Sequence, residues 1–166
     1  MRRVVVTGIG TINSTGHNVK DSFEAVVNGV CGIDAITLFD ASEFSVKIAG
    51  EVKDFDPTTV MDKKEVKKAD RFIQLGIKAA LEAMIDSGYV TQEDKKVDAS
   101  IADRFGMISG SGIGGLSTIE RNSIVCETKG SRKVSPFFIP SSLANMLSGF
   151  ISIEHNLRGP SLSHVT

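Results

Sequence analysis

The sequence predicts an α/β fold, with a largely parallel sheet and flanking helices. Short β-branched or apolar runs alternate along the chain with stretches whose apolar residues recur at helical spacing. Glycines gather in clusters, several of them where a strand is expected to turn into a helix. Strands that alternate with helices build layered folds with parallel sheets.

The composition excludes several classes of protein. The 166 residues carry 19 basic and 20 acidic side chains, so the formal net charge of −1 argues against a strongly basic nucleic-acid-binding protein. The apolar fraction of 41% is enough for a core. Because the apolar stretches are shorter than the roughly 18 residues that span a bilayer, no membrane partner is expected. Two cysteines make no disulfide framework, which favours the cytoplasm.

The first half of the chain is expected to hold two strands and two helices. Residues 3–8 form a β-branched run without alternation, typical of a strand buried on both faces. Residues 18–30 carry apolar residues at i, i+3, i+4 and i+7, which predicts an amphipathic helix. Residues 47–52 are expected to form a charged edge strand. Residues 63–87 show the longest helical pattern, and small residues on one face, Gly76 among them, predict close packing against a neighbour.

The second half repeats the alternation. A strand is expected over 104–109, followed by a glycine-rich turn and a helix that ends near Glu127. Residues 129–140 show no periodicity and are expected to form a loop. Ser141 and Ser142 are expected to open a further helix, and a last strand is expected from Ser161 onward.

The glycine loop, residues 110–115, matches the pattern G-x-G-x-x-G at Gly110, Gly112 and Gly115. After a strand and before a helix, such glycines let backbone N–H groups approach a pyrophosphate, so a nucleotide-binding α/β domain is one alternative. That fold also places an acidic residue about 20 positions on, at the end of a second strand, whereas Glu127 lies at a helix end. Glycines for close packing of helix on sheet are therefore the favoured interpretation.

A run of basic residues is the clearest charge pattern. Five of them, at spacings 0, 1, 4, 5 and 8, would share one face of the helix expected over 63–87: Lys63, Lys64, Lys67, Lys68 and Arg71. This face is either solvated or a docking surface for an acidic partner. Nucleic acid is the poorer partner, because no aromatic residues interleave for base stacking.

The histidines and cysteines suggest no catalytic or metal site. His17, His155 and His164 lack metal-ligand spacing and are expected to lie at the surface or to make local hydrogen bonds. Cys31 and Cys126 are expected to act as small apolar residues and not as nucleophiles. No metal and no cofactor is therefore expected.

Several of these stretches, in this order, resemble the β-ketoacyl-acyl carrier protein synthases, the condensing enzymes of fatty-acid synthesis, and most of all the type II elongating synthases. The resemblance covers the whole chain through six motifs: Arg3–Gly10, Ala49–Phe55, Asp70-Arg71-Phe72, Ser109–Leu116, Ser135–Ser141 and Leu157–Ser161. Departures are local. Asn13-Ser14-Thr15 stands where Ser-Pro is usual, and His164 replaces a customary apolar residue.

The resemblance implies a thiolase-like layered fold made of two similar halves and assembled as a homodimer. Residues 1–166 would then be an incomplete N-terminal domain, with the C-terminal half absent. In the family the last strand leads to a Thr-Ala-Cys sequence whose cysteine accepts the acyl chain, so the nucleophile is expected just after Thr166. The catalytic histidines and lysine of the family follow later still, so the 166 residues alone are expected to be inactive.

The resemblance also implies an activity and its partners. The intact protein would condense an acyl thioester with malonyl-acyl carrier protein to give 3-oxoacyl-acyl carrier protein, without a cofactor. Ile113 and Phe138 match residues that line the acyl pocket. Lys64, Lys67 and Lys68 match the basic surface that receives the acyl carrier protein. A non-catalytic synthase-like partner subunit is the second alternative, because such subunits lack the nucleophile.

Overall fold

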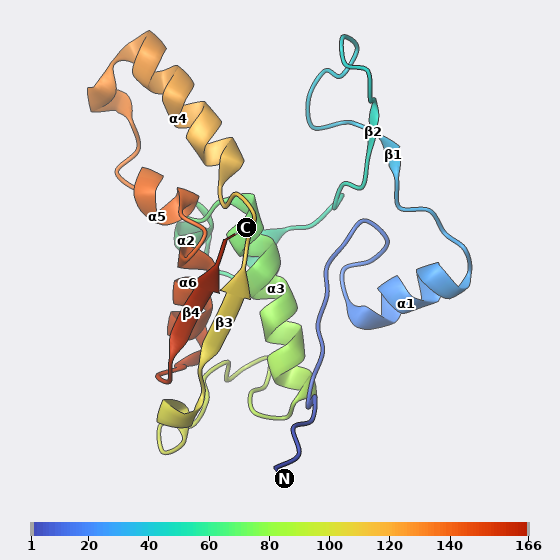
Figure 1. The fold of residues 1–166 in the computed structure, drawn as a ribbon, viewed down its shortest axis with the longest axis vertical. Helices are drawn as coiled ribbons and strands as arrows, with labels where there is room; N and C mark the ends of the chain where they lie inside the picture. Colours follow the sequence, from blue (N-terminus) through green and yellow to red (C-terminus); the bar gives the residue numbers. More distant parts are fainter. Residues whose placement is uncertain (1, 166) are drawn as a thin grey trace.

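The structure is a computed structural model that describes residues 2–165. Six α-helices and four short strands are defined in these residues (Figure 1). The helices are α1 (Val19–Val27), α2 (Lys63–Val66), α3 (Arg71–Asp86), α4 (Leu116–Lys129), α5 (Phe138–Ser142) and α6 (Met146–His155). The strands are β1 (Asp34–Ala35), β2 (Ile48–Ala49), β3 (Met107–Gly110) and β4 (Ser161–His164).

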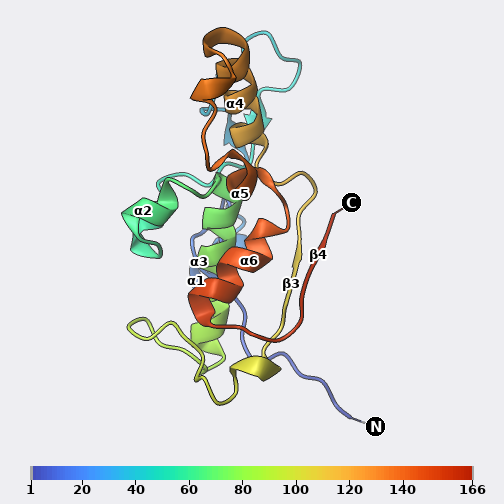
Figure 2. The same cartoon turned by 90° about the vertical axis from the view of Figure 1, so that its left-hand side faces the viewer.

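The core lies where α3 and α6 pack behind a parallel pair of strands. β3 and β4 pair in parallel, with Met107 opposite Ser161 and Gly110 opposite His164. α6 contacts both strands and α3, and Figure 2 shows it between the strands and α3. Ile73 of α3 is completely buried and belongs to the same apolar cluster as Ile151 of α6. The parallel pair, its flanking helices and their order confirm the predicted α/β architecture.

A second, two-stranded sheet stands apart from this core. β1 and β2 pair in antiparallel fashion, with Asp34 opposite Ala49 and Ala35 opposite Ile48. Figure 1 shows this pair above α1, with α3 between α1 and the strands β3 and β4. β2 confirms the expected edge strand, in a shorter form. α1 confirms the expected helix, but its apolar side chain Phe23 is 67% exposed instead of packed on the core.

Residues 3–8 are not the buried strand that their composition predicts. They have no strand partner among the described residues, and the side chain of Val4 is 94% exposed. A β-branched run becomes a strand only beside a hydrogen-bonding neighbour. The segment runs against α3 instead: the Ile9 N–H donates to Asp86 Oδ2 at 3.0 Å, and the Thr11 N–H donates to Glu82 Oε2 at 3.1 Å.

The helix predicted over 63–87 is two helices, α2 and α3, with a turn between them. Asp70 causes the break: its backbone is extended (φ −66°, ψ 163°) and its carboxylate accepts from the Phe72 N–H, so it is the N-cap of α3. The side-chain amide of Gln74 donates to the Ala69 carbonyl oxygen at 2.9 Å and closes the turn. At the other end, Gly88 has φ +78° and follows the last turn, as a C-terminal glycine does.

Ser141 and Ser142 end a helix, where the sequence predicts that they open one. The hydroxyl of Ser141 donates to the Phe137 carbonyl oxygen at 2.5 Å, and the hydroxyl of Ser142 donates to the Ile139 carbonyl oxygen at 3.3 Å. Serines that bond back to the preceding turn satisfy carbonyls that a longer helix would use. The backbone is extended again at Leu143, and α6 begins three residues later. Part of the expected 129–140 loop is therefore helical.

Small residues on α3 allow two close approaches, as the sequence predicts. A Cβ added to Gly76 would overlap the side chain of Leu147 in α6. The second close approach is between residue 10 and α3, where a Cβ added to Gly10 would overlap the carbonyl oxygen of Ala79. The first clash involves a flexible side-chain end, whereas the second involves backbone that cannot move without disturbing α3.

Two glycine substitutions separate close packing from helix propensity. Gly10→Ala should lower the free energy of unfolding of the intact protein by about 1–3 kcal/mol, because the segment must move away from α3. Gly149 lies inside α6, where an added Cβ would be 3.8 Å from Cε of Met146. Gly149→Ala should therefore raise the free energy of unfolding by about 0.5–1 kcal/mol. Urea unfolding curves measure both changes, and a Gly10→Ala variant as stable as the parent would refute the close approach.

Candidate functional site

The carboxyl ends of β3 and β4 meet at one edge of the sheet. Gly110 ends β3 opposite His164 of β4, and the Ser111 N–H donates to the His164 carbonyl oxygen at 3.1 Å. The glycine loop therefore starts beside the end of β4. Chemistry in open α/β sheets is placed just outside the carboxyl ends of the strands. This edge is the candidate active-site region, and Ile113 lies in the loop that borders it.

The second half of the glycine loop is pressed against the end of α5. Gly114 has φ +80°, and a Cβ added there would be 2.5 Å from the Ser142 carbonyl oxygen. The Gly115 N–H donates to the same oxygen at 2.9 Å. By contrast, a Cβ added to Gly110 or Gly112 would meet nothing within 4 Å. The last two glycines are thus closely packed, but against the end of α5 and not between helix and sheet as predicted, and the first two border open space.

Asp70 is the group that holds the start of α4. Its side chain is buried (8% exposed) and its Oδ2 accepts both the Thr118 N–H at 2.9 Å and the Thr118 hydroxyl at 2.5 Å. Its other oxygen accepts the Phe72 N–H of α3 at 3.4 Å. One carboxylate therefore satisfies N-terminal donors of two helices and lies at the positive end of both dipoles.

This carboxylate weighs against the nucleotide alternative. A pyrophosphate in a glycine-rich loop binds to the free N–H groups at the N-terminus of the following helix. Here the Thr118 N–H already donates to Asp70, and the N–H groups of Gly115 and Ile119 donate to backbone carbonyl oxygens. A phosphate at this end of α4 would lie against a buried negative charge.

Arg71 is not part of the docking surface in which the spacing placed it. Its guanidinium donates to the Val52 carbonyl oxygen at 3.1 Å and to the Phe55 carbonyl oxygen at 3.3 Å, and its centre is 5.0 Å from the centroid of the Phe55 ring. The side chain therefore attaches the segment after β2 to the start of α3. The adjacent Asp70 attaches α4 to the same point.

The three predicted docking lysines lie together on α2 and the turn after it. Lys64 and Lys67 are exposed, whereas Lys68 is half-buried. The Lys68 ammonium is 2.6 Å from Glu65 Oε1 and 5.6 Å from the centroid of the Phe137 ring. The single helical stripe that the spacing predicts is wrong, because the chain turns at Asp70, but the three lysines remain in one short segment.

The two predicted acyl-pocket residues lie on elements that touch each other. Ile113 is 65% exposed in the glycine loop, and Phe138 is the half-buried first residue of α5. The carbonyl oxygen of Ser142, the last residue of α5, accepts the Gly115 N–H from the glycine loop. Ile113 and Phe138 therefore lie on two elements that are in contact, although the contact itself is made by Gly115 and Ser142.

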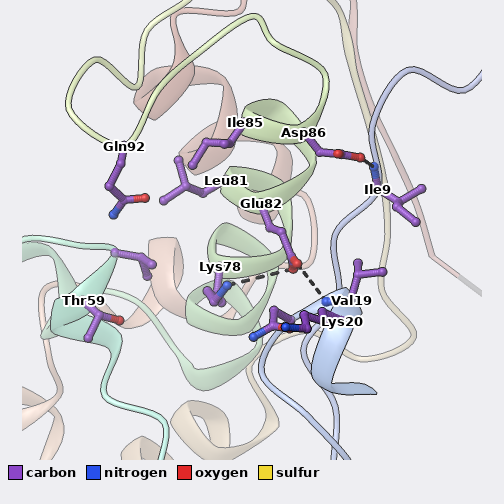
Figure 3. Close-up of a pocket in the computed structure, with 12 residues that line it drawn as sticks. Ile9, Val19, Lys20, Thr59, Lys78, Leu81, Glu82, Ile85, Asp86 and Gln92 are labelled. Carbon is purple, nitrogen blue, oxygen red and sulfur yellow. Dashed lines mark hydrogen bonds and ion pairs between the residues drawn. The ribbon is translucent and has the colours of Figure 1, made fainter. Parts of the chain in front are cut away.

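Two cavities were not predicted from the sequence. A groove of about 1080 Å³ lies between the β1–β2 sheet and the elements α3, α4 and α5, and its lining includes Lys67, Arg121 and Lys133. A pocket of about 640 Å³ lies between α1 and α3 (Figure 3). In it Glu82 accepts the Val19 N–H at 2.8 Å and lies 4.0 Å from the Lys78 ammonium. Both cavities are formed by segments distant in sequence, which periodicity does not reveal.

The histidines and cysteines offer no metal site within residues 2–165, where no group of three potential ligands gathers. His17 is 2.8 Å from the Lys53 carbonyl oxygen through Nε2, and the buried His155 is 2.7 Å from the Lys95 carbonyl oxygen through Nδ1. Both histidines make hydrogen bonds, but these join residues 36 and 60 positions apart and are not the local bonds that the sequence predicts. Cys31 and Cys126 are exposed, which corrects the expectation that they pack as small apolar residues. No described helix has the length and apolar content needed to cross a membrane.

Glu51, in the wall of the groove, carries a lowered pKa. Its carboxylate accepts the Thr37 hydroxyl at 2.7 Å, the Thr37 N–H at 3.0 Å and the Leu38 N–H at 3.2 Å. These bonds, that of the Thr37 hydroxyl first, hold the pKa of Glu51 below its ordinary value of 4.5. The ionised side chain fixes the loop after β1.

Comparison with known proteins gives consistent matches. Residues 1–166 match the family described as "Beta-ketoacyl synthase, N-terminal domain". The chain is 45% identical over 165 residues to 3-oxoacyl-[acyl-carrier-protein] synthase 2 of Coxiella burnetii, a match that covers 99% of this chain and 38% of the relative. The chain thus spans well under half the length of this curated relative.

Solved structures show the same fold. The ishigamide ketosynthase/chain length factor is 28% identical with a TM-score of 0.79, over 99% of this chain and 40% of that one. A type II PKS acyl-carrier protein in complex with its ketosynthase matches at 23% identity and a TM-score of 0.74, over 97% of this chain and 41% of that one. These matches confirm the predicted thiolase-like layered α/β fold.

The lowered pKa of Glu51 predicts a pH-sensitive loop. A carboxylate whose pKa is depressed on folding stabilises the fold above pH 4.5, and this contribution is lost as the pH falls through the folded-state value. The amide protection factors of Thr37 and Leu38, measured by NMR hydrogen exchange, should therefore fall below pH 4.5 while that of Ile77 in α3 stays constant. In Glu51→Gln the two factors should not change over the same range. A similar fall in that variant would assign the effect to another group.

Proposed function

Because this chain belongs to the β-ketoacyl synthase family, as its N-terminal domain, we propose that the protein condenses an acyl thioester with malonyl-acyl carrier protein and so forms 3-oxoacyl-acyl carrier protein in fatty-acid elongation. The observation that carries the proposal is the 45% identity, over 99% of this chain, to a protein named 3-oxoacyl-[acyl-carrier-protein] synthase 2. The six sequence motifs support it because they are spread over the whole chain.

The reaction has two steps in this proposal. A cysteine thiolate attacks the acyl thioester, the acyl group moves to its sulfur, and the carrier thiol leaves. Malonyl-acyl carrier protein then loses carbon dioxide, and the resulting carbanion attacks the cysteine-bound thioester and releases the thiolate. The family resemblance places that cysteine after Thr166, which lies outside the described residues. The parallel register supports a place beside the glycine loop, since β4 ends opposite Gly110.

Within this chain the proposed contributions are recognition and shape. Ile113 and Phe138 would line the acyl pocket, and Lys64, Lys67 and Lys68 would bind acidic groups of the acyl carrier protein. One structural relative is a ketosynthase in complex with its acyl-carrier protein, which supports a carrier protein as the partner here. We also propose a cytoplasmic homodimer, as the resemblance implies.

The direct test uses the intact purified protein with acyl- and malonyl-acyl carrier protein. We expect a 3-oxoacyl-acyl carrier protein product and one covalently bound acyl group per catalytic chain, both detected by mass spectrometry. A non-catalytic partner subunit is the second candidate, since one relative is described as a ketosynthase/chain length factor. Such a subunit would form no acyl-enzyme alone but would support product formation by a catalytic partner.

The exposed lysines should control carrier binding. In the intact protein, the double reversal Lys64→Glu with Lys67→Glu should raise KM for acyl carrier protein substrates roughly tenfold or more, mainly through slower association. Small acyl thioesters without a carrier should react as before. The double reversal Lys20→Glu with Lys96→Glu, at two exposed lysines outside this segment, is the charge-matched control. Equal losses for carrier-bound and carrier-free substrates would make these lysines structural.

The side chain of Ile113 should limit acyl-chain length. Ile113→Phe adds several heavy atoms to the proposed pocket wall, and overpacking costs about 1–3 kcal/mol. We expect kcat/KM for long acyl chains to fall roughly 5- to 100-fold, with little change for short ones. Ile153→Phe, on the exposed face of α6, is the control for an added surface aromatic. Unchanged long-chain turnover in folded Ile113→Phe would remove Ile113 from the pocket.

A further inference from the structure

Lys68 differs in its surroundings from the two lysines beside it. Lys64 and Lys67 are exposed, and neither ammonium group takes part in an ion pair with another of the described residues. Lys68 is half-buried, its ammonium is paired with Glu65 at 2.6 Å, and the same ammonium faces the ring of Phe137. A cation held by both a carboxylate and an aromatic face is restrained in a way that a freely moving docking charge is not.

Phe137 connects Lys68 to α5. Phe137 directly precedes this helix, and its carbonyl oxygen accepts both the backbone N–H of Ser141 at 3.0 Å and the Ser141 hydroxyl at 2.5 Å. Its own N–H donates to the Ser135 hydroxyl at 3.2 Å. Phe137, which faces the Lys68 ammonium, therefore supplies the carbonyl oxygen that accepts hydrogen bonds from Ser141 near the other end of α5.

The other end of α5 holds the glycine loop. The Ser142 carbonyl oxygen accepts the Gly115 N–H at 2.9 Å, and the space around Gly114 and Gly115 is too small for a Cβ. α5 is only five residues long. Lys68 and the loop that carries Ile113 thus contact opposite ends of one short, hydrogen-bonded helix, and a shift at one end reaches the other through backbone contacts.

We propose that Lys68 is a positioning residue that couples the docking of the carrier protein to the shape of the acyl pocket; this inference rests on the proposed function. With no carrier bound, Lys68 holds Phe137, and through α5 it holds the glycine loop. An acidic group of the carrier competes with Glu65 and the ring for the ammonium. When the ammonium moves to the carrier, α5 and the loop beside Ile113 are released at the moment of acyl delivery.

The expected effect is modest and measurable. A partly exposed cation–π contact corresponds to about a two- to fivefold change in an equilibrium constant. Lys68→Gln should therefore raise hydrogen–deuterium exchange in peptides that span α5 and the glycine loop. It should also raise, by about two- to fivefold, the ratio of kcat/KM for dodecanoyl- to hexanoyl-N-acetylcysteamine, carrier-free thioesters that bind no docking surface, because the released loop no longer holds Ile113 in the path of a long chain. Lys68→Arg, which keeps the charge over the ring, should restore both values.

Two further variants identify the contact responsible. Phe137→Leu should reproduce the Lys68→Gln exchange pattern, and the double variant should be no worse than either single one, because both remove the same interaction. Lys67→Gln is the matched comparison: it should raise KM for carrier-bound substrate but leave α5 exchange and the chain-length ratio unchanged.

The outcomes separate this inference from the proposed function. If Lys68→Gln leaves exchange and the ratio unchanged while Lys67→Gln raises KM for the carrier substrate, the coupling is overturned and the function stands. Additive effects of Lys68→Gln and Phe137→Leu would also overturn the coupling. If the parent protein condenses neither carrier-bound nor carrier-free thioesters, the proposed function fails and the inference fails with it.

Discussion

The arrangement of the candidate site depends on one buried carboxylate. Asp70 caps α3 and, from the same side chain, accepts the N–H and hydroxyl of Thr118 in α4. The next residue, Arg71, binds the carbonyl oxygens of Val52 and Phe55. Two adjacent residues thus join three segments that are far apart in sequence. Removing the carboxylate would leave buried helix donors without partners, which costs more than the net value of the bonds.

This junction fixes the distance between the two surfaces that the proposed function needs. The proposed docking lysines lie just before Asp70, and the glycine loop precedes α4, whose Thr118 N–H donates to Asp70. A second connection, through Phe137 and α5, runs between the same two surfaces. Carrier recognition and the proposed acyl pocket are therefore attached to one framework by two routes. The first is a buried, hydrogen-bonded junction, and the second is the partly exposed contact of Lys68 with Phe137 that, in the proposed coupling, an acidic partner displaces.

The sequence predicted those elements that local pattern determines. The helices α1, α4 and α6 and the strands β3 and β4 follow from apolar periodicity and glycine position. The continuous helical pattern over 63–87 concealed the N-cap at Asp70, although an aspartate before an apolar run is a start signal. Residues 3–8 were misassigned because a strand also requires a neighbour, which composition does not report. For the proposed site, the resemblance supplied Ile113 and Phe138, and the spacing of basic residues together with the resemblance supplied the three lysines. The contact of Lys68 with Phe137 and the groove beside Lys67 arise from tertiary packing and left no local signal.

Asp70 joins α3 and α4 through Thr118, and a double-mutant cycle in the intact protein measures the strength of this connection. Asp70→Ala, Thr118→Val and the double variant are compared by their free energies of unfolding in urea. We expect the two changes to be coupled by about 0.5–3 kcal/mol, because both remove the buried bond between the Thr118 hydroxyl and Asp70 Oδ2. If the two costs in free energy add to within about 0.3–0.5 kcal/mol, Asp70 does not join the helices through Thr118, since residues that act independently show no coupling.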